Sequence, residues 1–219
     1  MSDLLYMSIS NEIENKIKEG IFAENDKLPS ERILAENYGV SRTVIREALK
    51  LLHEKGLVNI MTGRGNYVTI PKEQDLIDKF ETAIDNSGIN QADIIEAREI
   101  IEIAISQRLI SRVSDEDILI LKQIYSVMDA NFYDIEQYAK LDAKFHLQLA
   151  SCTKNNVLRM ITATLNNVTD RKVLSNNIQV RLSAHKEHLA IINAIEERNN
   201  DKLEIAIRQH INCFKEHIK

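Results

Sequence analysis

The sequence predicts a mainly α-helical protein, with an N-terminal winged helix-turn-helix and a C-terminal all-α bundle of six or seven helices. Apolar residues recur at helical spacing along most of the 219 residues, which include only two prolines and six glycines. Strand-like alternation is confined to residues 57–70, and no proline follows Pro71. We therefore divide the chain into two expected domains, residues 1–71 and residues 72–219.

The composition is that of a globular protein, with 44% hydrophobic and 28% charged residues. The first residues include acidic side chains and no apolar segment, so we expect no signal peptide. No apolar run reaches the length of about 18 residues that a membrane span needs. Cys152 and Cys213 lack the spacing of a metal motif, which favours two reduced structural thiols in a cytoplasmic protein.

Three helices are expected in the N-terminal domain. Residues 4–19 form the first, because isoleucines follow one another there at spacings of four. Ser30 is placed to cap a short second helix that ends at the turn around Gly39. Ser41 is placed to cap a third helix, which ends before Gly56.

A hairpin and a long helical region follow. Residues 57–60 and 66–70 are the expected strands, and the glycine-containing tip at residues 61–65 joins them, so three helices and a hairpin outline a winged helix. Ser114 and Asp117 are spaced as a capping box. No fixed repeat is visible, which favours a bundle over a solenoid. Helices are expected at residues 73–85, 91–112, 115–130, 132–150, 155–174, 179–198 and 201–217.

The charge distribution points to one segment that can bind a polyanion. The chain has a net charge of −5, and residues 1–26 hold six acidic and two basic side chains. Residues 27–64, in contrast, hold seven basic and four acidic side chains. A locally positive segment in an acidic protein is expected where only that segment contacts phosphate.

The third helix carries the side chains that suit base recognition. Arg42 and Arg46 are four residues apart and project from one face. The arginine fork matches the O6 and N7 acceptors of guanine, and Thr43 can contact a thymine methyl group or a phosphate. The alternative is that these residues form an ordinary solvated helix face, since exposed charge on helices is common.

The surrounding residues suit contact with the DNA backbone. Ser30 and Ser41 stand at helix starts, where free backbone N–H groups favour a phosphate oxygen. Arg32, near the start of the second helix, can reach the same backbone. At the tip of the hairpin, Arg64 lies between two glycines and is placed to enter the minor groove.

The motif as a whole resembles the DNA-binding domain of the GntR family. From Leu28 to Val68 the match is K-L-P-S-E-R-x-L-A-x-x-Y-G-V-S-R-x-x-I-R-E-A-L-x-x-L-x-x-x-G-L-V, followed by G-R-G-x-x-V. The resemblance implies a homodimeric, operator-binding regulator. Repression is the family's default, and activation is the alternative. The expected DNA-binding residues are Ser30, Arg32, Ser41, Arg42, Thr43, Arg46, Gly63, Arg64 and Gly65.

The second half of the chain carries histidines on apolar helix faces. Asp142 and His146 are four residues apart, so both can reach one ion from a single helix. His188 and His210 lie among apolar residues on two further helices. Buried polar groups need partners, and one metal ion would satisfy all four side chains. The alternative is that each histidine is hydrogen-bonded separately within the core.

These positions resemble the helical, FCD-type ligand-binding domain of the FadR-like subfamily of GntR regulators. The motifs are D-x-x-F-H-x-x-L, E-H-x-x-I-x-x-A-I and R-x-H-I. The resemblance implies a divalent metal such as Zn, Ni or Mn, with Arg98 and Asn156 facing an effector pocket; Asn155 stands where the family usually has glycine. His185 and His217 receive no role. The implied metal ligands are Asp142, His146, His188 and His210.

We therefore expect a transcriptional regulator whose affinity for operator DNA is controlled by a small organic acid bound at the metal. A metal-dependent enzyme is the rival hypothesis, because three histidines and a carboxylate also serve hydrolases and oxygenases. Against an enzyme stand the absence of a nucleophile motif, a phosphate loop or an evident general base. A nonspecific nucleoid protein is a third hypothesis, and it predicts salt-dependent binding without sequence preference.

Overall fold

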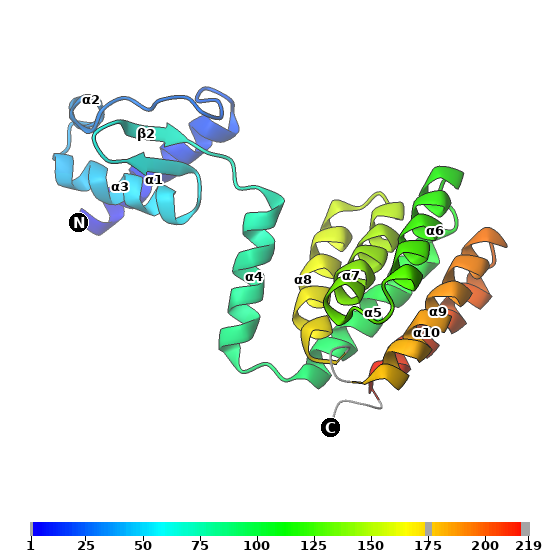
Figure 1. Ribbon diagram of the computed structural model, residues 1–219. Helices are drawn as coiled ribbons and strands as arrows, with labels where there is room; N and C mark the ends of the chain where they lie inside the picture. Colours follow the sequence, from blue (N-terminus) through cyan, green and yellow to red (C-terminus); the bar gives the residue numbers. More distant parts are fainter. Residues whose placement is uncertain (1, 174–176, 216–219) are drawn as a thin grey trace. The chain divides into compact units, whose positions relative to one another are not determined.

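The computed structural model of the chain describes residues 2–173 and 177–215, and within these ranges it describes all side chains except those of residues 2–4, 170–173 and 214. His217 therefore lies outside the described residues. The chain forms two compact units, Met1–Lys72 and Glu73–Lys219, each with its own hydrophobic core (Figure 1). No helix in the described part of the chain is long and apolar enough to cross a membrane.

The N-terminal unit contains the three helices and the hairpin that the sequence predicts. Its core is built from one face of each helix, with Ile13, Ile45 and Leu52 fully buried. The hairpin is antiparallel, and its register pairs Val58 with Val68 and Met61 with Gly65. The elements are α1 (Ser2–Lys18), α2 (Glu31–Tyr38), α3 (Arg42–Glu54), β1 (Val58–Met61) and β2 (Gly65–Val68).

Local capping chemistry fixes the helix-turn-helix. The hydroxyl of Ser30 accepts a hydrogen bond from the backbone N–H of Ile33, and that of Ser41 accepts one from Val44. Gly39 closes α2 with φ of 64°, in the left-handed region that favours glycine. The predicted caps and the predicted turn are therefore confirmed.

The hairpin differs from its prediction by about one residue at each end. The expected strands were residues 57–60 and 66–70, whereas pairing begins at Val58 and ends at Val68. Because Met61 pairs with Gly65, only three residues remain for the turn. Lys27 adds an isolated bridge to Tyr67 that no strand pattern indicates.

The described residues of the C-terminal unit form seven helices joined by turns and loops, within the predicted number of six or seven. Figure 1 shows α5 to α10 gathered into a bundle, with α4 beside α8. Tyr138, Phe145, Leu121 and Met128 are fully buried in its core. The helices are α4 (Glu73–Ser87), α5 (Gln91–Leu109), α6 (Asp115–Ala130), α7 (Ile135–Cys152), α8 (Asn156–Val173), α9 (Ile178–Glu196) and α10 (Asn200–Lys215).

Two details of this unit follow from single side chains. Helix α7 begins at Ile135 rather than at residue 132, because the carboxylate of Asp134 caps it by accepting from the backbone N–H of Gln137 at 3.0 Å.

Both cysteines are free thiols, and burial raises the pKa of Cys152 to about 12, which keeps that thiol protonated.

The predicted capping box at the start of α6 is confirmed. The backbone N–H of Ser114 donates to the carboxylate of Asp117 at 3.0 Å, and the N–H of Asp117 donates to the Ser114 hydroxyl at 3.1 Å. Lys154 also donates to this carboxylate, at 3.0 Å. Burial alone raises the pKa of Asp117, but the bonds from Ser114 and Lys154 outweigh burial and lower it below its ordinary value.

We predict that Asp117→Asn lowers the free energy of unfolding at pH 7 by about 1 kcal/mol. Since the pKa of Asp117 is lowered in the folded state, its stabilisation is present above the unfolded pKa of about 4 and is lost as the pH falls through the folded pKa. The difference from wild type therefore shrinks as the pH falls from about 4 through the lower, folded-state pKa of Asp117. Urea unfolding at a series of pH values measures it.

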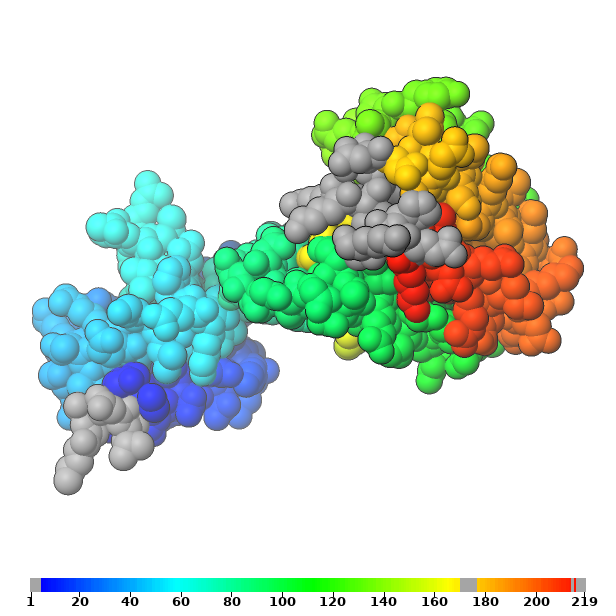
Figure 2. All heavy atoms as spheres, turned by 90° about the horizontal axis from the view of Figure 1, so that it is seen from below, coloured from blue at the N-terminus to red at the C-terminus, as the bar shows by residue number. Residues whose placement is uncertain are grey.

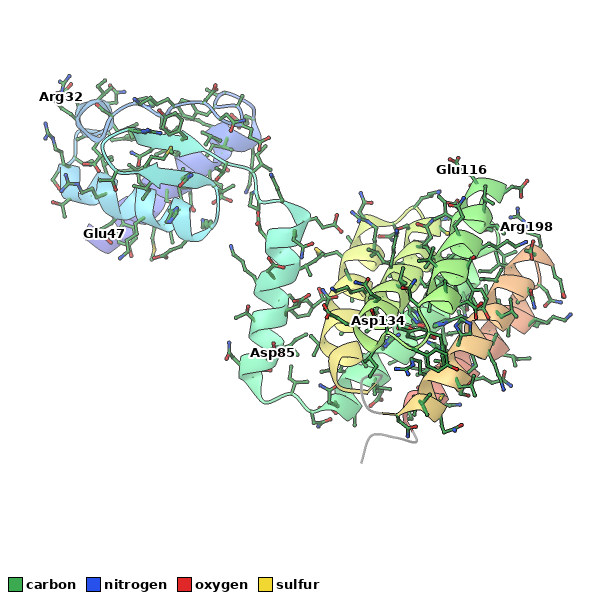
Figure 3. The ribbon with its side chains drawn as sticks, viewed as in Figure 1. Arg32, Glu47, Asp85, Glu116, Asp134 and Arg198 are labelled. Atoms are coloured by element: carbon green, nitrogen blue, oxygen red, sulfur yellow. The ribbon has the colours of Figure 1, made fainter. Side chains whose placement is uncertain are left out.

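The matched control is Glu116→Gln, which removes the same charge from the same helical turn. Glu116 is exposed and points away from the bundle in Figure 3. This variant should unfold like wild type at every pH. Equal destabilisation by the two substitutions would show that charge near the helix start, rather than the cap, is responsible.

Candidate nucleic-acid interface and metal centre

The predicted DNA-binding side chains lie on the surface of the N-terminal unit. Helix α3 buries Ile45, Leu49 and Leu52, so Arg42 and Arg46 project from its other face. Arg32 lies at the outer edge of the same unit (Figure 3). The exposed residues of the predicted set are Ser30, Arg32, Ser41, Arg42, Thr43, Arg46, Gly63 and Arg64, while Gly65 is half-buried.

Two of these arginines are held by neighbouring carboxylates. The Nε of Arg46 donates to Glu31 at 2.7 Å, which links α3 to the first turn of α2. Arg32 donates to Glu36, one turn along α2, at 2.6 Å. Sequence reasoning missed the role of Glu31, because nothing local indicates which residue of α3 its side chain meets. The pairing orients Arg46 while leaving its side chain 65% exposed.

The hairpin forms a projecting wing with a glycine on each side of its terminal arginine. Figure 2 shows the hairpin atoms, in cyan, standing out from the rest of the N-terminal unit. Gly63 and Gly65 have φ of 74° and 114°, which other residues rarely adopt. A Cβ at Gly65 would also come within 2.8 Å of the Lys27 Cε, at the flexible end of that side chain, so the backbone angle is the stronger constraint. Glycine is therefore required where Arg64 is presented.

In the C-terminal unit, the four predicted metal ligands come together in the core. The Nε2 atom of His146 lies 3.0 Å from that of His210 and 3.4 Å from that of His188. A carboxylate oxygen of Asp142 lies 3.3 Å from the Nε2 of His188, and the other lies 3.9 Å from the Nε2 of His146. All four residues are at most 1% exposed. Three helices, α7, α9 and α10, supply them.

Carboxylates stand behind two of the imidazoles. Glu102 on α5 lies 3.3 Å from the Nδ1 of His146, and Glu187 on α9 lies 3.2 Å from the Nδ1 of His210. A carboxylate at Nδ1 favours a proton on that nitrogen, which leaves the Nε2 lone pair directed into the cluster. Neither glutamate was predicted from the sequence. Glu187 adjoins His188 along the chain, but the pairing itself depends on how the helices pack.

The surroundings shift the pKa values of these groups in different directions. Burial lowers the pKa of His188 well below its ordinary value, and it lowers that of His210 despite the bond to Glu187. Burial also disfavours charge on His146, but the adjacent Glu102 outweighs it and raises the pKa. The pKa of Glu102 is lowered, because His146 and Arg98 outweigh its burial.

The residues fit a divalent metal ion. With metal–nitrogen bonds of about 2.0–2.1 Å, two imidazole nitrogens on one ion lie about 3.0–3.4 Å apart, the spacing found here. Without an ion, the three buried imidazoles would direct their Nε2 atoms at one another in a low-dielectric interior. Three nitrogens and one carboxylate form a donor set suited to Zn, Ni or Mn. An ion held there would act as a Lewis acid toward oxygen donors of a ligand.

The remaining predicted site residues lie in contrasting places. Arg98 is buried, and its Nε donates to Glu102 at 2.7 Å, so it adjoins the cluster through that glutamate. Asn156 is exposed at the start of α8, where Asn155 provides the cap by accepting from two backbone N–H groups. Asn156 therefore has no place among the buried polar residues. His185, which received no role, bonds to Asp129 outside the cluster.

Several regulators resemble the chain along nearly its whole length. The Uxu operon regulator of Haemophilus influenzae is 28% identical over 217 residues, covering 96% of this chain and 80% of that protein. The Exu regulon transcriptional regulator of Escherichia coli K12 is 28% identical over 221 residues, covering 96% and 83%. The transcriptional repressor NanR of Salmonella schwarzengrund is 27% identical over 215 residues, covering 93% and 80%.

A solved structure agrees with the fold. The Streptococcus agalactiae GntR structure superposes with a TM-score of 0.73 at 23% identity, covering 96% of this chain and 99% of that one. The sequence profile of the bacterial regulatory proteins of the gntR family matches residues 5–68, and that of the FCD domain matches residues 93–212. The chain therefore belongs to the GntR family, as a transcriptional regulator with an FCD domain, and it is not an enzyme.

Proposed function

We propose that this regulator is a homodimeric repressor that binds a specific operator through residues 1–71. Residues 72–219 sense a small organic acid at a metal ion. The observation that carries the proposal is the convergence of three buried imidazole nitrogens within 4.8 Å of one another. An all-apolar core would be simpler to fold, so a cluster of this kind favours a ligand-binding role.

The exposed arginines support sequence-specific binding. Arg42 and Arg46 share the outer face of α3, where a helix-turn-helix presents its base-reading side chains. Ser30 and Ser41 stand at helix starts, where backbone N–H groups can hold phosphate. Arg64 on the wing then reaches the minor groove of the same site. A symmetric dimer reads two half-sites about 34 Å apart.

The buried cluster supports control by an effector. Three imidazoles and a carboxylate leave open positions on a metal ion that takes more than four ligands. An organic acid binds in those positions, and Arg98 contributes positive charge beside them. An effector that prefers one arrangement of the helical domain about 100-fold supplies about 2.7 kcal/mol, which releases part of the bound operator. The same differential affinity couples operator and effector binding in both directions.

We predict that Arg46→Ala loses about 1–3 kcal/mol of discrimination between operator and unrelated DNA. The probe is the consensus that wild-type protein selects from a random duplex library, and fluorescence anisotropy measures the affinity. Lys18→Ala, on α1 of the same unit, is the control and should bind like wild type. Lys18 pairs with Glu14, which also bonds to Lys55 just past the C-terminal end of α3, whereas the predicted base-reading residues lie in the first turns of that helix. Selection without a consensus would favour the nonspecific nucleoid protein.

We predict that protein purified without an affinity tag holds about one divalent ion per chain and that His188→Ala holds close to none. Elemental analysis after dialysis measures the content. His185→Ala is the matched control on the same helix, because His185 is also nearly buried but bonds to Asp129 instead. Equal metal content in the two variants would remove the metal from the proposal.

We predict that Glu102→Gln weakens metal affinity about 10- to 100-fold, since an amide holds the His146 ring less firmly than a carboxylate. Competition with a chromophoric chelator measures the affinity. Glu96→Gln is the control, because Glu96 lies on the exposed face of the same helix. Unchanged affinity in Glu102→Gln would mean that this glutamate only neutralises Arg98.

A further inference from the structure

A second buried arginine lies on the same helix as His188 and makes no ion pair with a carboxylate among the described residues. Arg181, in the first turns of α9, is 5% exposed. Its guanidinium carbon lies 5.1 Å from the ring centroid of Phe132 and 5.9 Å from that of Tyr138. Its Nε is buried and finds no hydrogen-bond partner in the described part of the chain.

The other arginines of this unit show how a structural guanidinium is normally satisfied. Arg98 pairs with Glu102 at 2.7 Å. Arg198 donates to the carbonyl of Val113 at 2.7 Å and to Asp115 at 3.0 Å. A buried cation without such partners is unfavourable, because cation–π contacts with two aromatic rings offset only part of the free energy of desolvation. Arg181 is therefore placed as a receptor for an anion.

Helix geometry places Arg181 next to the proposed metal site. Arg181 and His188 are seven residues apart on α9, so they share one face of that helix. On α7, Tyr138 stands one turn before Asp142, whose carboxylate lies 3.3 Å from the Nε2 of His188. The Arg181–Tyr138 contact is thus one to two helical turns from the cluster, about 6–10 Å along the bundle.

We propose that Arg181 binds the distal carboxylate of an effector whose other end supplies oxygen donors to the metal. The effector class is a short dianionic organic acid, such as a dicarboxylic acid, rather than a monocarboxylate. This inference rests on the proposed function. It assigns the distal charge to Arg181 instead of Arg98, because Glu102 already balances Arg98. The flat faces of Phe132 and Tyr138 hold the guanidinium fork in place for bidentate pairing.

The alternative is that Arg181 is an aromatic packing residue with no ligand. A packing role predicts that its replacement lowers stability and leaves anion binding unchanged. An anion receptor predicts the reverse, because removing an unpaired buried charge relieves desolvation and abolishes the response to anions. Arg181→Met separates the two, since methionine is unbranched and still packs against aromatic rings.

The experiment is isothermal titration calorimetry of the metal-loaded protein with succinate, glutarate and adipate. Each dicarboxylate is compared with its monoamide, which has nearly the same size and one charge fewer. Sodium phosphate, followed by the shift in melting temperature, is an additional probe that does not depend on chain length. Arg198→Met is the control, because Arg198 follows α9 and is satisfied by partners of its own (Figure 3).

We expect wild type and Arg198→Met to bind at least one dicarboxylate roughly tenfold or more tightly than its monoamide, as a charge-assisted pair requires. Arg181→Met should lose this preference and any stabilisation by phosphate, and it should melt at or above the wild-type temperature without added anion. Arg181→Lys keeps the charge but lacks the guanidinium fork, so it should retain a reduced preference for the dicarboxylate over its monoamide. This variant also tests the proposal if Arg181→Met does not fold.

The proposal is overturned if no dicarboxylate or phosphate response depends on Arg181, including the case in which wild type responds to none. A lower melting temperature with unchanged anion binding would assign the residue to packing. These outcomes are separate from failure of the proposed function, because operator selection and metal content are measured without any acid. Loss of dicarboxylate binding in His188→Ala would show that the same acid that binds Arg181 also needs the metal site.

Discussion

The stability of the C-terminal unit depends on how its buried imidazole nitrogens are satisfied in an apolar interior. Imidazole nitrogens 3.0 and 3.4 Å apart direct lone pairs toward a common point, which is unfavourable in an apolar interior unless a cation is shared. The ligands come from α7, α9 and α10, helices far apart along the chain. An ion held there joins these helices, so metal affinity and the packing of the bundle are contributions to one free energy.

Carboxylates lie beside several of the basic side chains in the interior of the C-terminal unit. Glu102 stands between Arg98 and His146, and it connects a guanidinium to an imidazole through one carboxylate. Glu187 lies 3.2 Å from the Nδ1 of His210. Because Arg98, His146 and His210 each have a specific carboxylate neighbour, an anion that entered this interior would compete with existing pairs.

Features of the fold that arise from local chemistry could be read from the sequence. Ser30, Ser41 and Ser114 cap helices where predicted, because a cap involves only residues within one turn. The pairing of Glu31 with Arg46 and of Glu102 with His146 could not be predicted, since it depends on the angle at which helices pack. Asn156 was expected in a pocket but is exposed, because Asn155 takes the cap and leaves its neighbour outside.

The contact between Glu31 and Arg46 has a consequence for partner choice. An exposed ion pair contributes only about 0–1 kcal/mol, so it orients the arginine without holding it strongly. A duplex that offers a guanine at the right position replaces the carboxylate with two good acceptors. A duplex that lacks one must still displace Glu31 or accept its negative charge close to phosphate. If Arg46 reads a base as proposed, competition from Glu31 adds at most about 1 kcal/mol of discrimination against duplexes that lack the matching acceptors.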